Sequence, residues 1–301
     1  MRRNPKLLAA AARSLEEQGH AVTLKPTGGP GDATRIAARC VDGDADLILA
    51  AGGDGTINEV ANGMIGSQVP LGILPAGTAN VLATETRLGS CPARAAGGLD
   101  GLDPVRIAVG LLRTEGAERH FLLMAGAGLD AHIVAHLNPK VKKALGKGAY
   151  WLSGWQSAFR RLEELDVECG SERVRCSFAL ASRVRNYGGD LEIARGASLL
   201  HEHFEVVLFE GANPLRFVKY FAGVVAGNAG RMRGVHVLPA RCVTLRPASR
   251  ETVHIQVDGE EAGTLPARLE VVPDALTLLL PADFAKRERQ RWTTSRTPSR
   301  D

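Results

Sequence analysis

The chain of 301 residues has no long hydrophobic run and few aromatic side chains, which make up 5% of its residues. No stretch approaches the roughly 20 consecutive apolar residues that a membrane-spanning helix needs. The basic start at Met1–Lys6 leads into an Ala-rich segment that Arg13 and Glu16 interrupt, so the apolar core of a secretory signal is also lacking. These absences indicate a cytoplasmic protein.

Cysteines are few and scattered, and no two have the spacing of metal ligands. An odd number of widely separated cysteines does not suit a disulfide framework, so we expect reduced thiols, as in cytoplasmic proteins. The five are Cys40, Cys91, Cys169, Cys176 and Cys242.

Charge is also close to balanced, with a formal net charge of +4. Basic residues gather near the C-terminus, in Lys286–Arg291 and at Arg296 and Arg300. One interpretation is a solvated helix end followed by a disordered tail over 293–301. The other is peripheral contact with anionic headgroups on the inner face of the membrane, worth about 1 kcal/mol per basic residue. No nucleic-acid partner is expected, because no recognised nucleic-acid module accompanies the charge.

The first part of the chain alternates between helical and strand patterns, which predicts a parallel α/β layer. The run Leu47–Ala51 is wholly apolar, as a strand buried on both faces should be. The predicted helices are 7–18, 32–41 with Asp32 as its cap, 57–65 and one from Val81. The predicted strands are 21–24, 47–51 and 71–74.

After Pro92 the predicted segments become short, rich in β-forming residues and separated by turns, which indicates a mostly antiparallel domain. A helical insert is expected from about Lys140 to Leu165. The expected domains are 1–95 plus 281–292, which bind nucleotide, and 96–280, which binds the substrate. The predicted strands here are 105–112, 121–124, 178–184, 204–209, 243–246, 253–257, 269–272 and 276–280.

The most informative motif is Gly52–Glu59, which lies between a predicted buried strand and a helix. Glycines allow close approach of the backbone to a ligand, and a helix N-terminus offers N–H groups to phosphate. Asp54 fits an anion site when a divalent cation mediates, as in Mg²⁺–nucleotide sites. By itself the motif is equally compatible with a tight turn that needs glycine and a capping Asp.

A second motif, Pro75–Asn80, has the same setting after the next predicted strand. Two Gly-rich turns at one edge of a parallel sheet form a crevice of the kind in which such folds bind ligands. Thr78 and Asn80 would add side-chain hydrogen bonds to a nucleotide.

Together these motifs resemble the catalytic domain of diacylglycerol kinases, which bacterial lipid kinases, sphingosine kinases and ceramide kinases share. The resemblance covers nearly the whole chain. It implies an N-terminal Rossmann-like domain of the NAD kinase and diacylglycerol kinase type and a C-terminal antiparallel β-sandwich-like domain. Further matching positions are Thr27, Gly31–Ala33, Gly126–Ala131, Tyr187–Gly189, Asp258–Glu260 and Pro266.

The resemblance implies a kinase that transfers the γ-phosphoryl group of ATP to a lipid hydroxyl, with Mg²⁺ as cofactor. Asp54 would organise the Mg²⁺, directly or through water, although in sphingosine kinase-like members it is the proposed base. Glu260 would be the general base, and Asp130 would join the acidic network near the metal. The implied nucleotide contacts are Thr27, Gly52, Gly53, Asp54, Gly55, Thr56, Glu59, Gly77, Thr78 and Asn80.

The sequence departs from the family pattern in three places, of which one, Val81 in place of the common Asp after Gly77–Asn80, is a variation that the family tolerates. Family members begin with a strand and an Asn-Pro element, whereas Asn4–Pro5 here starts the first predicted helix, so we expect an exposed edge of the parallel sheet. Some bacterial members hold a structural Mg²⁺ in the segment that corresponds to 193–204. The residues Leu200–His203 differ from the pattern there, which argues against a second metal.

Two rival functions remain, together with an open question about the acceptor. An NAD kinase shares the Gly-Gly-Asp-Gly turn, but Gly77–Asn80 and Asp258–Glu260 argue against it. A catalytically silent relative would have no need to retain Asp54, Asp130 and Glu260. The stripe formed by Trp151, Trp155 and Phe159 suits a core or an acyl channel, and it does not identify the lipid.

Overall fold

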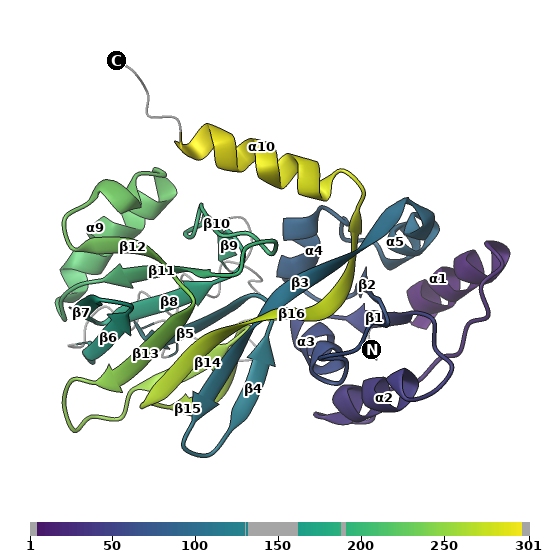
Figure 1. The fold of residues 1–301 in the computed structure, drawn as a ribbon, viewed down its shortest axis with the longest axis horizontal. Helices are drawn as coiled ribbons and strands as arrows, with labels where there is room; N and C mark the ends of the chain where they lie inside the picture. Colours follow the sequence, from purple (N-terminus) through teal and green to yellow (C-terminus); the bar gives the residue numbers. More distant parts are fainter. Residues whose placement is uncertain (1–4, 130, 132–161, 188–190, 297–301) are drawn as a thin grey trace. The chain divides into compact units, whose positions relative to one another are not determined.

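The computed structural model describes residues 5–129, 131, 162–187 and 191–296 (Figure 1). Its contacts divide the chain into two compact units, residues 1–108 with 273–301 and residues 109–272. Strands β3 (Leu102–Thr114) and β16 (Ala267–Pro281) continue from one unit into the other. The domain limits expected from the sequence, near residues 95 and 280, stay a prediction.

The first unit is a parallel α/β layer. Strand β1 (Ile48–Gly52) pairs in parallel with β2 (Leu71–Pro75), and β2 pairs in parallel with the end of β16 at Leu278. Every residue of β2 is buried, as its apolar sequence predicts for a strand covered on both faces. The helices are α1 (Pro5–Glu17), α2 (Asp32–Val41), α3 (Asp54–Asn62), α4 (Val81–Thr86), α5 (Pro92–Gly97), the 3₁₀ helix η1 (Leu99–Gly101) and α10 (Phe284–Arg296).

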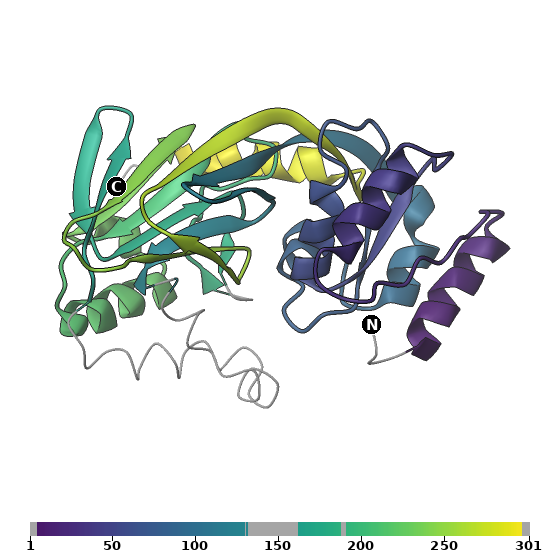
Figure 2. The same ribbon diagram turned by 90° about the horizontal axis from the view of Figure 1, so that it is seen from below.

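Helices cover the strands of this unit from two sides (Figure 2). On one side Ala11 and Leu15 of α1 and Ala96 of α5 form a core with Ala51 of β1 and Leu74 of β2. Helices α2 and α3 pack against each other, and α3 also packs on β1. Because successive strand residues point to opposite faces, a strand between two helix layers has no polar face. The prediction of an α/β layer is confirmed.

The strand predicted at 21–24 is wrong. These residues are described and form no strand, although Val22 packs against the core of the unit. A strand needs a neighbour for its backbone hydrogen bonds, and β1 pairs with β2 alone among the described strands. Leu24, at the end of the segment, is 56% exposed. One side of β1 is therefore an edge of the sheet.

Two helices of the first unit differ from the sequence prediction. Helix α3 begins at Asp54 rather than near Ile57, so Asp54 and Thr56 lie in its first turn. Helix α5 was not predicted, although Pro92 at its start is a common first helical residue. The chain returns to this unit after β16 as α10, which runs to Arg296, and residues 297–301 of the predicted tail lie outside the described part.

The second unit contains two sheets. One continues along β16, β13 (Cys242–Pro247), β6 (Leu165–Cys169) and β7 (Glu172–Cys176), with β3 and β4 (Glu118–Phe121) joined to β16. The other has the order β12 (Val235–Ala240), β11 (Phe204–Phe209), β8 (Phe178–Ser182), β5 (Met124–Gly128), β14 (His254–Val257) and β15 (Glu260–Thr264). The remaining elements are β9 (Asn186–Tyr187), β10 (Leu191–Glu192), α9 (Pro214–Val225) and the 3₁₀ helix η2 (Ala229–Arg231).

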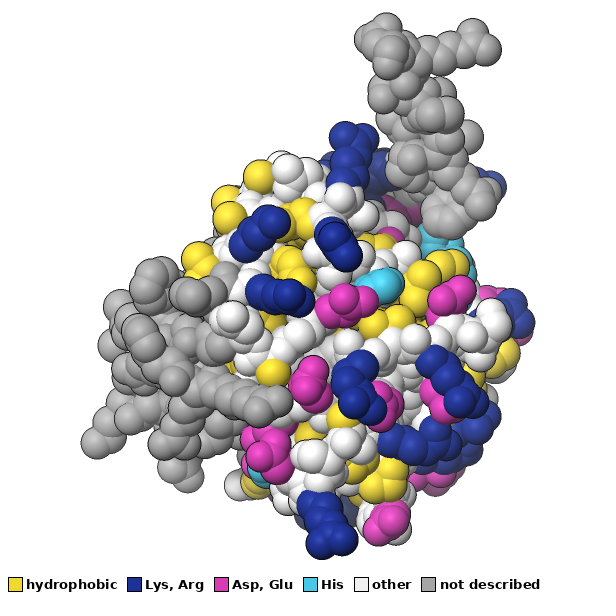
Figure 3. Space-filling model, turned by 90° about the vertical axis from the view of Figure 1, so that its left-hand side faces the viewer, with side chains coloured by type: hydrophobic (Ala, Val, Ile, Leu, Met, Phe, Trp, Pro, Cys, Tyr) yellow, Lys and Arg dark blue, Asp and Glu magenta, His cyan; other side chains and the backbone are white. Residues whose placement is uncertain are grey.

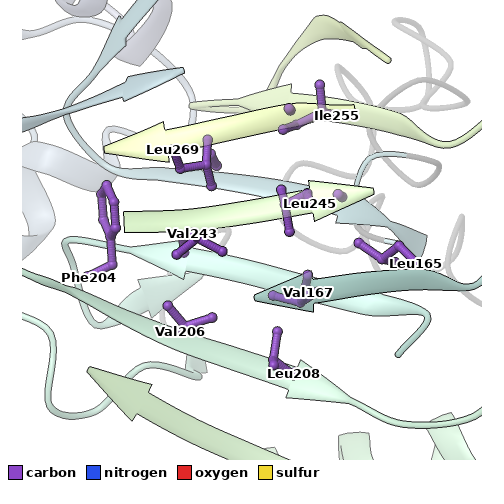
Figure 4. Close-up of a cluster of buried hydrophobic side chains, with 14 of the residues drawn as sticks. Leu165, Val167, Phe204, Val206, Leu208, Val243, Leu245, Ile255 and Leu269 are labelled. Carbon is purple, nitrogen blue, oxygen red and sulfur yellow. The ribbon is translucent and has the colours of Figure 1, made fainter. Parts of the chain in front are cut away.

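The two sheets share one hydrophobic core, which Figure 4 shows in part. Leu165 and Val243 come from the first sheet, and Val206 and Ile255 come from the second. Two sheets that bury their inner faces against each other define a β-sandwich. The prediction of an antiparallel β-sandwich-like domain is confirmed.

Several strand predictions in this unit need correction. The strand expected at 121–124 is the end of β4 and the start of β5, and those expected at 269–272 and 276–280 are one continuous strand, β16. The hairpin β6–β7 was missed, and Leu165, the expected end of the helical insert, begins β6. Residues 162–164 of that insert are described and form no helix, and residues 140–161 lie outside the described part.

The helices are short throughout the described chain. The longest, α1 and α10, have 13 residues each. Among the described residues, none of the helices is long and apolar enough to span a bilayer.

Substitution of Gly110 tests how tightly Phe121 packs in the core of the second unit. Phe121 is fully buried, stacks on Phe204 at 5.6 Å between ring centroids, and lies opposite Gly110 across β3 and β4. A Cβ atom at Gly110 would lie 2.2 Å from the Phe121 ring. We expect Gly110→Ala to lower the free energy of unfolding by about 1–3 kcal/mol, because the core has no room for the methyl group.

The matched control for Gly110→Ala is Gly116→Ala, measured by urea unfolding. Gly116 lies in the exposed turn after β3, and a Cβ atom there would meet no atom within 4 Å. Its effect should stay within about 0.5 kcal/mol. Equal effects of the two substitutions would contradict the packing described for Phe121.

Candidate active site

Two Gly-rich turns follow β1 and β2 at the same edge of the parallel sheet. Gly52 and Pro75 are paired in register at the strand ends, and the Ala76 N–H donates to the Gly52 carbonyl at 2.8 Å. A Cβ atom on Gly77 would lie 2.4 Å from the Cα atom of Gly53. A Cβ atom on Gly53 would lie 3.2 Å from the Gly77 Cα, so the close backbone contact of the two turns requires glycine above all at position 77.

Asp54 connects the two turns. It lies in the first turn of α3, and its Oδ1 accepts a hydrogen bond from the N–H of Leu82 in the first turn of α4, at 3.2 Å. In the part of the chain that the structure describes, Oδ2 accepts no hydrogen bond. Carboxylate oxygen is a ligand that Mg²⁺ prefers, and Mg²⁺ is usually held by one or two carboxylates with phosphate and water. This carboxylate therefore suits the metal that the sequence implies.

The surface above the turns is open to a ligand. Gly53, Gly55 and Thr56 are partly exposed, and Thr78 is exposed. The N–H groups of the first turn of α3 lie here, at the positive end of the helix dipole. The arrangement can bind a phosphate group through backbone N–H groups and hydroxyl side chains.

Asn80 shapes the second turn. Its backbone is left-handed, with φ of 47°, and its side chain accepts from the Gly77 N–H at 2.8 Å and donates to the Gly77 carbonyl at 3.1 Å. Both polar atoms of the amide are thus engaged with Gly77. The expected contact of Asn80 with nucleotide stays a prediction.

Glu59 and Asp32 organise the start of α2. Glu59 accepts from the Ala33 N–H at 3.2 Å, which joins α3 to α2. Gly31 rather than Asp32 is the cap residue of α2, so the predicted cap is one residue off. Asp32 instead accepts from the N–H groups of Gly28 and Gly29, and the bond to Gly28 is the largest cause that lowers its pKa. These contacts fix the turn that follows Thr27.

In the second unit, Asp258 holds the turn between β14 and β15. Its carboxylate accepts three backbone N–H groups, from Leu122 at 3.0 Å and from Leu123 and Met124 at 2.9 Å each. Its φ of 51° is left-handed, which Asp and Asn tolerate better than most residues. Taken alone, Asp258–Glu260 predicts a hairpin turn after the strand that ends at Val257, and β14 and β15 form that hairpin. The sequence assigned no contacts to the Asp258 side chain.

Glu260, the expected general base, follows this turn as the first residue of β15. Its side chain is 49% exposed and pairs with Arg119 of β4, with 2.6 Å between Oε2 and Nη2. Arg119 was not singled out from the sequence, because 141 residues separate the two partners. The pair orients the carboxylate, and Asp258 holds the turn that precedes Glu260.

The expected site residues fall into separate groups. Asp54 with both glycine turns lies in the first unit and Glu260 lies in the second, and each group is described within its own unit. Asp130 lies outside the described residues, so its role stays a prediction. Strand β5 ends just before it at Gly128, where φ is 74° and a Cβ atom would lie 2.4 Å from the Ser177 carbonyl.

A buried arginine holds the segment around His201. Arg183 is fully buried and donates to the carbonyls of Leu199 at 2.7 Å and His201 at 2.6 Å, and burial lowers its pKa to about 10. The rings of His201 and His203 stack at 4.8 Å. No three His, Cys, Asp or Glu side chains in the described ranges are grouped so that they could hold a metal ion.

Comparison with known protein families shows the family to which this chain belongs. The diacylglycerol kinase catalytic domain matches residues 2–111, and the YegS C-terminal NAD kinase beta sandwich-like domain matches residues 124–280. The chain belongs to the lipid kinase family that these two domains define.

Individual relatives agree with this class. The diacylglycerol kinase of Bacillus subtilis is 26% identical over 93% of each chain. A probable YegS-like lipid kinase of Pseudomonas putida is 28% identical over 91% of this chain and 90% of its own. Among solved structures, a putative diacylglycerol kinase from Bacillus anthracis has the same fold, with a TM-score of 0.74, 19% identity and coverage of 93% and 89%. An NAD kinase from Archaeoglobus fulgidus in complex with ATP has a TM-score of 0.53 at 10% identity, covering 96% of this chain and 95% of its own.

The three hydrogen bonds to Asp258 predict a large loss of stability for a substitution that barely changes shape. Asp258→Asn keeps one accepting oxygen and tolerates the positive φ, but it removes the charge and the second acceptor. We expect the free energy of unfolding to fall by about 2–3 kcal/mol, because bonds to a charged acceptor are strong and an unmatched buried N–H is costly.

Asp274→Asn provides the matched control for this measurement by urea unfolding. Asp274 also has a positive φ, of 53°, but its side chain is 85% exposed and its ion pair with Arg106 spans 3.9 Å. Its substitution should change stability by less than about 0.5 kcal/mol. If both Asn variants were equally stable, the Asp258 carboxylate would not hold the turn.

Proposed function

We propose that this protein transfers the γ-phosphoryl group of ATP to the hydroxyl of a lipid, with diacylglycerol as the first acceptor to test. The observation that carries the proposal is the direct contact of the two glycine turns, which Asp54 connects. Membership in the lipid kinase family and the relatives named diacylglycerol kinase support the choice of reaction and acceptor.

The first unit would hold ATP. The N–H groups of the α3 first turn, with Thr56 and Thr78 beside them, suit the phosphates, since a helix N-terminus attracts anions. That an NAD kinase of similar fold was solved in complex with ATP supports ATP as the co-substrate. Gly53 and Gly77 leave room for the phosphates to approach the backbone.

Mg²⁺ would be held by Asp54, directly or through water, with Asp130 as a further candidate. When bound, the ion neutralises charge on the phosphate oxygens. The residues of the chain position the reactants, which is the main protein contribution to phosphoryl transfer. Asp54 is suited to this because Oδ1 is held by the Leu82 N–H while Oδ2 stays available.

Glu260 would accept the proton of the lipid hydroxyl. The hydroxyl oxygen forms a bond to the γ-phosphorus, the bond from that phosphorus to the bridging oxygen breaks, and ADP leaves. The carboxylate is half exposed, so a hydroxyl can approach it, and Arg119 keeps it oriented. A positioned base contributes about 10²–10⁴-fold in rate.

Asp54→Asn tests the first half of this proposal. Asn keeps an oxygen for the Leu82 N–H but removes the charge that would bind Mg²⁺, so phosphate transfer should fall about 100-fold or more while folding is retained. Asp44→Asn, in an exposed turn, is the control and should be fully active.

The assay follows labelled ATP with Mg²⁺ and a panel of micellar acceptors, comprising diacylglycerol, a sphingoid base, ceramide, phosphatidylglycerol and NAD. A labelled lipid that disappears with Asp54→Asn would support the kinase and name its acceptor. Labelled NADP would instead identify an NAD kinase. ATP binding without any product would identify a silent relative.

Glu260→Gln tests the second half. Removal of the base should lower kcat about 100-fold or more and leave the affinity for ATP unchanged. Glu261→Gln is the neighbouring control, since the exposed side chain of Glu261 pairs with His254 of β14 and the variant should keep full activity. A normal kcat for Glu260→Gln would assign the base to another residue.

A further inference from the structure

The outer face of α9 carries an apolar stripe that the core does not use. Val218 is 49% exposed and Val225 is 63% exposed, and with exposed Ala222 they follow the i, i+4, i+7 spacing of one helix face. Val237, on neighbouring β12, is 39% exposed. Five large hydrophobic side chains are exposed in the described residues, and three of them lie on α9 and β12.

The opposite face anchors this helix firmly. Tyr220 is buried, and the rings of Phe217 and Tyr220 pack on Phe209 with centroids 5.9 Å and 5.2 Å away. At the C-terminal end, the carbonyl of Gly227 accepts from Arg195 at 2.9 Å. Because α9 is fixed from within, its exposed valines are a property of the surface.

Exposed basic residues lie on the same segment of the chain as these valines. From Gly211 to Arg250 the sequence contains no Asp or Glu. The side of the second unit that bears α9 shows Lys and Arg side chains beside hydrophobic ones (Figure 3). The exposed basic residues of α9, η2 and the turn after it are Arg216, Lys219, Arg231 and Arg233.

We propose that α9 and η2 form a docking surface for an anionic lipid bilayer, here called the α9 surface and defined by Val218, Val225, Arg216, Lys219, Arg231 and Arg233. Basic side chains would contact lipid phosphates, and the valines would enter the boundary between headgroups and acyl chains. The basic side chains favour an anionic partner because their charge is complementary to it. The exposed valines favour a lipid partner because they can enter its apolar region. Its purpose rests on the proposed lipid kinase, because the surface would bring the enzyme to its substrate.

The basic helix α10, which the sequence offers as a membrane contact, is a weaker candidate. Its Arg287 pairs with Asp283 at 3.0 Å and its Arg291 pairs with Glu288 at 3.6 Å. Among its described side chains, α10 exposes no large hydrophobic residue. Two of the basic side chains of α10 are paired and its described side chains form no apolar stripe, so the α9 surface is the stronger candidate.

Vesicle co-sedimentation tests the α9 surface in the absence of ATP. The intact protein should bind vesicles of phosphatidylcholine mixed with phosphatidylglycerol more tightly than vesicles of phosphatidylcholine alone. The variant R216Q/K219Q/R231Q/R233Q should bind the anionic vesicles at least about tenfold more weakly. The control R13Q/R39Q/R94Q/R250Q removes the same charge from exposed arginines elsewhere and should bind like the intact protein.

A second variant, V218N/V225N, keeps every charge and removes the apolar stripe. It should also bind more weakly, and its circular dichroism should match that of the intact protein because neither valine is in the core. The proposal is overturned if the intact protein ignores anionic vesicles, if the control loses as much as the α9 variant, or if V218N/V225N binds normally. A dimer in solution that V218N/V225N abolishes, with vesicle binding intact, would assign the stripe to a second copy.

Phosphate transfer to acceptors in detergent micelles separates this proposal from the proposed function. The α9 variants should keep that activity, because no residue of the α9 surface belongs to the proposed catalytic machinery. Loss of vesicle binding with retained micellar activity supports the docking surface. If the intact protein has no kinase activity but binds vesicles through the α9 surface, the docking surface is supported and the proposed function is overturned.

Discussion

The backbone contact between the turns after β1 and β2 is the constraint on which the candidate site depends. Gly53 and Gly77 approach so closely that a single methyl group on Gly77 would clash with the backbone of the other turn. This contact brings the N-terminus of α3 beside Asn80 and the start of α4, and it lets Asp54 of one turn accept from Leu82 of the other. The parallel register of the two strands sets the contact, because Gly52 and Pro75 end side by side.

The second unit uses a carboxylate for a comparable purpose. Asp258 accepts hydrogen bonds from three N–H groups at the link between β4 and β5, so its carboxylate holds this link in addition to the packing of the buried side chains there. The turn between β14 and β15 leads directly into Glu260. The partner of Glu260, Arg119, lies on β4. A network of this kind is sensitive to loss of any member, because each leaves a buried donor or an unbalanced charge.

Local sequence patterns predicted much of the fold and of the site. Apolar runs such as Leu71–Leu74 are decisive because a strand buried on both faces has no polar positions, and glycine turns directly after such runs mark the ligand edge. The strand expected at 21–24 shows the limit of this reasoning. Its apolar and β-branched residues suit a strand, but a strand exists only where a neighbour completes its hydrogen bonds, and residues 21–24 pair with none of the described strands.

The sequence by itself determined the two glycine motifs, the parallel α/β layer and the resemblance to lipid kinases, since these depend on residues close together in the chain. Only the tertiary structure decided which groups the carboxylates contact. Arg119 and Glu260 are 141 residues apart, and Asp258 is 136 residues from Leu122. It also decided that one face of α9 is buried on Phe209 while Val218 and Val225 stay exposed. Pairing and burial depend on which distant segments meet, and local periodicity carries no information about that.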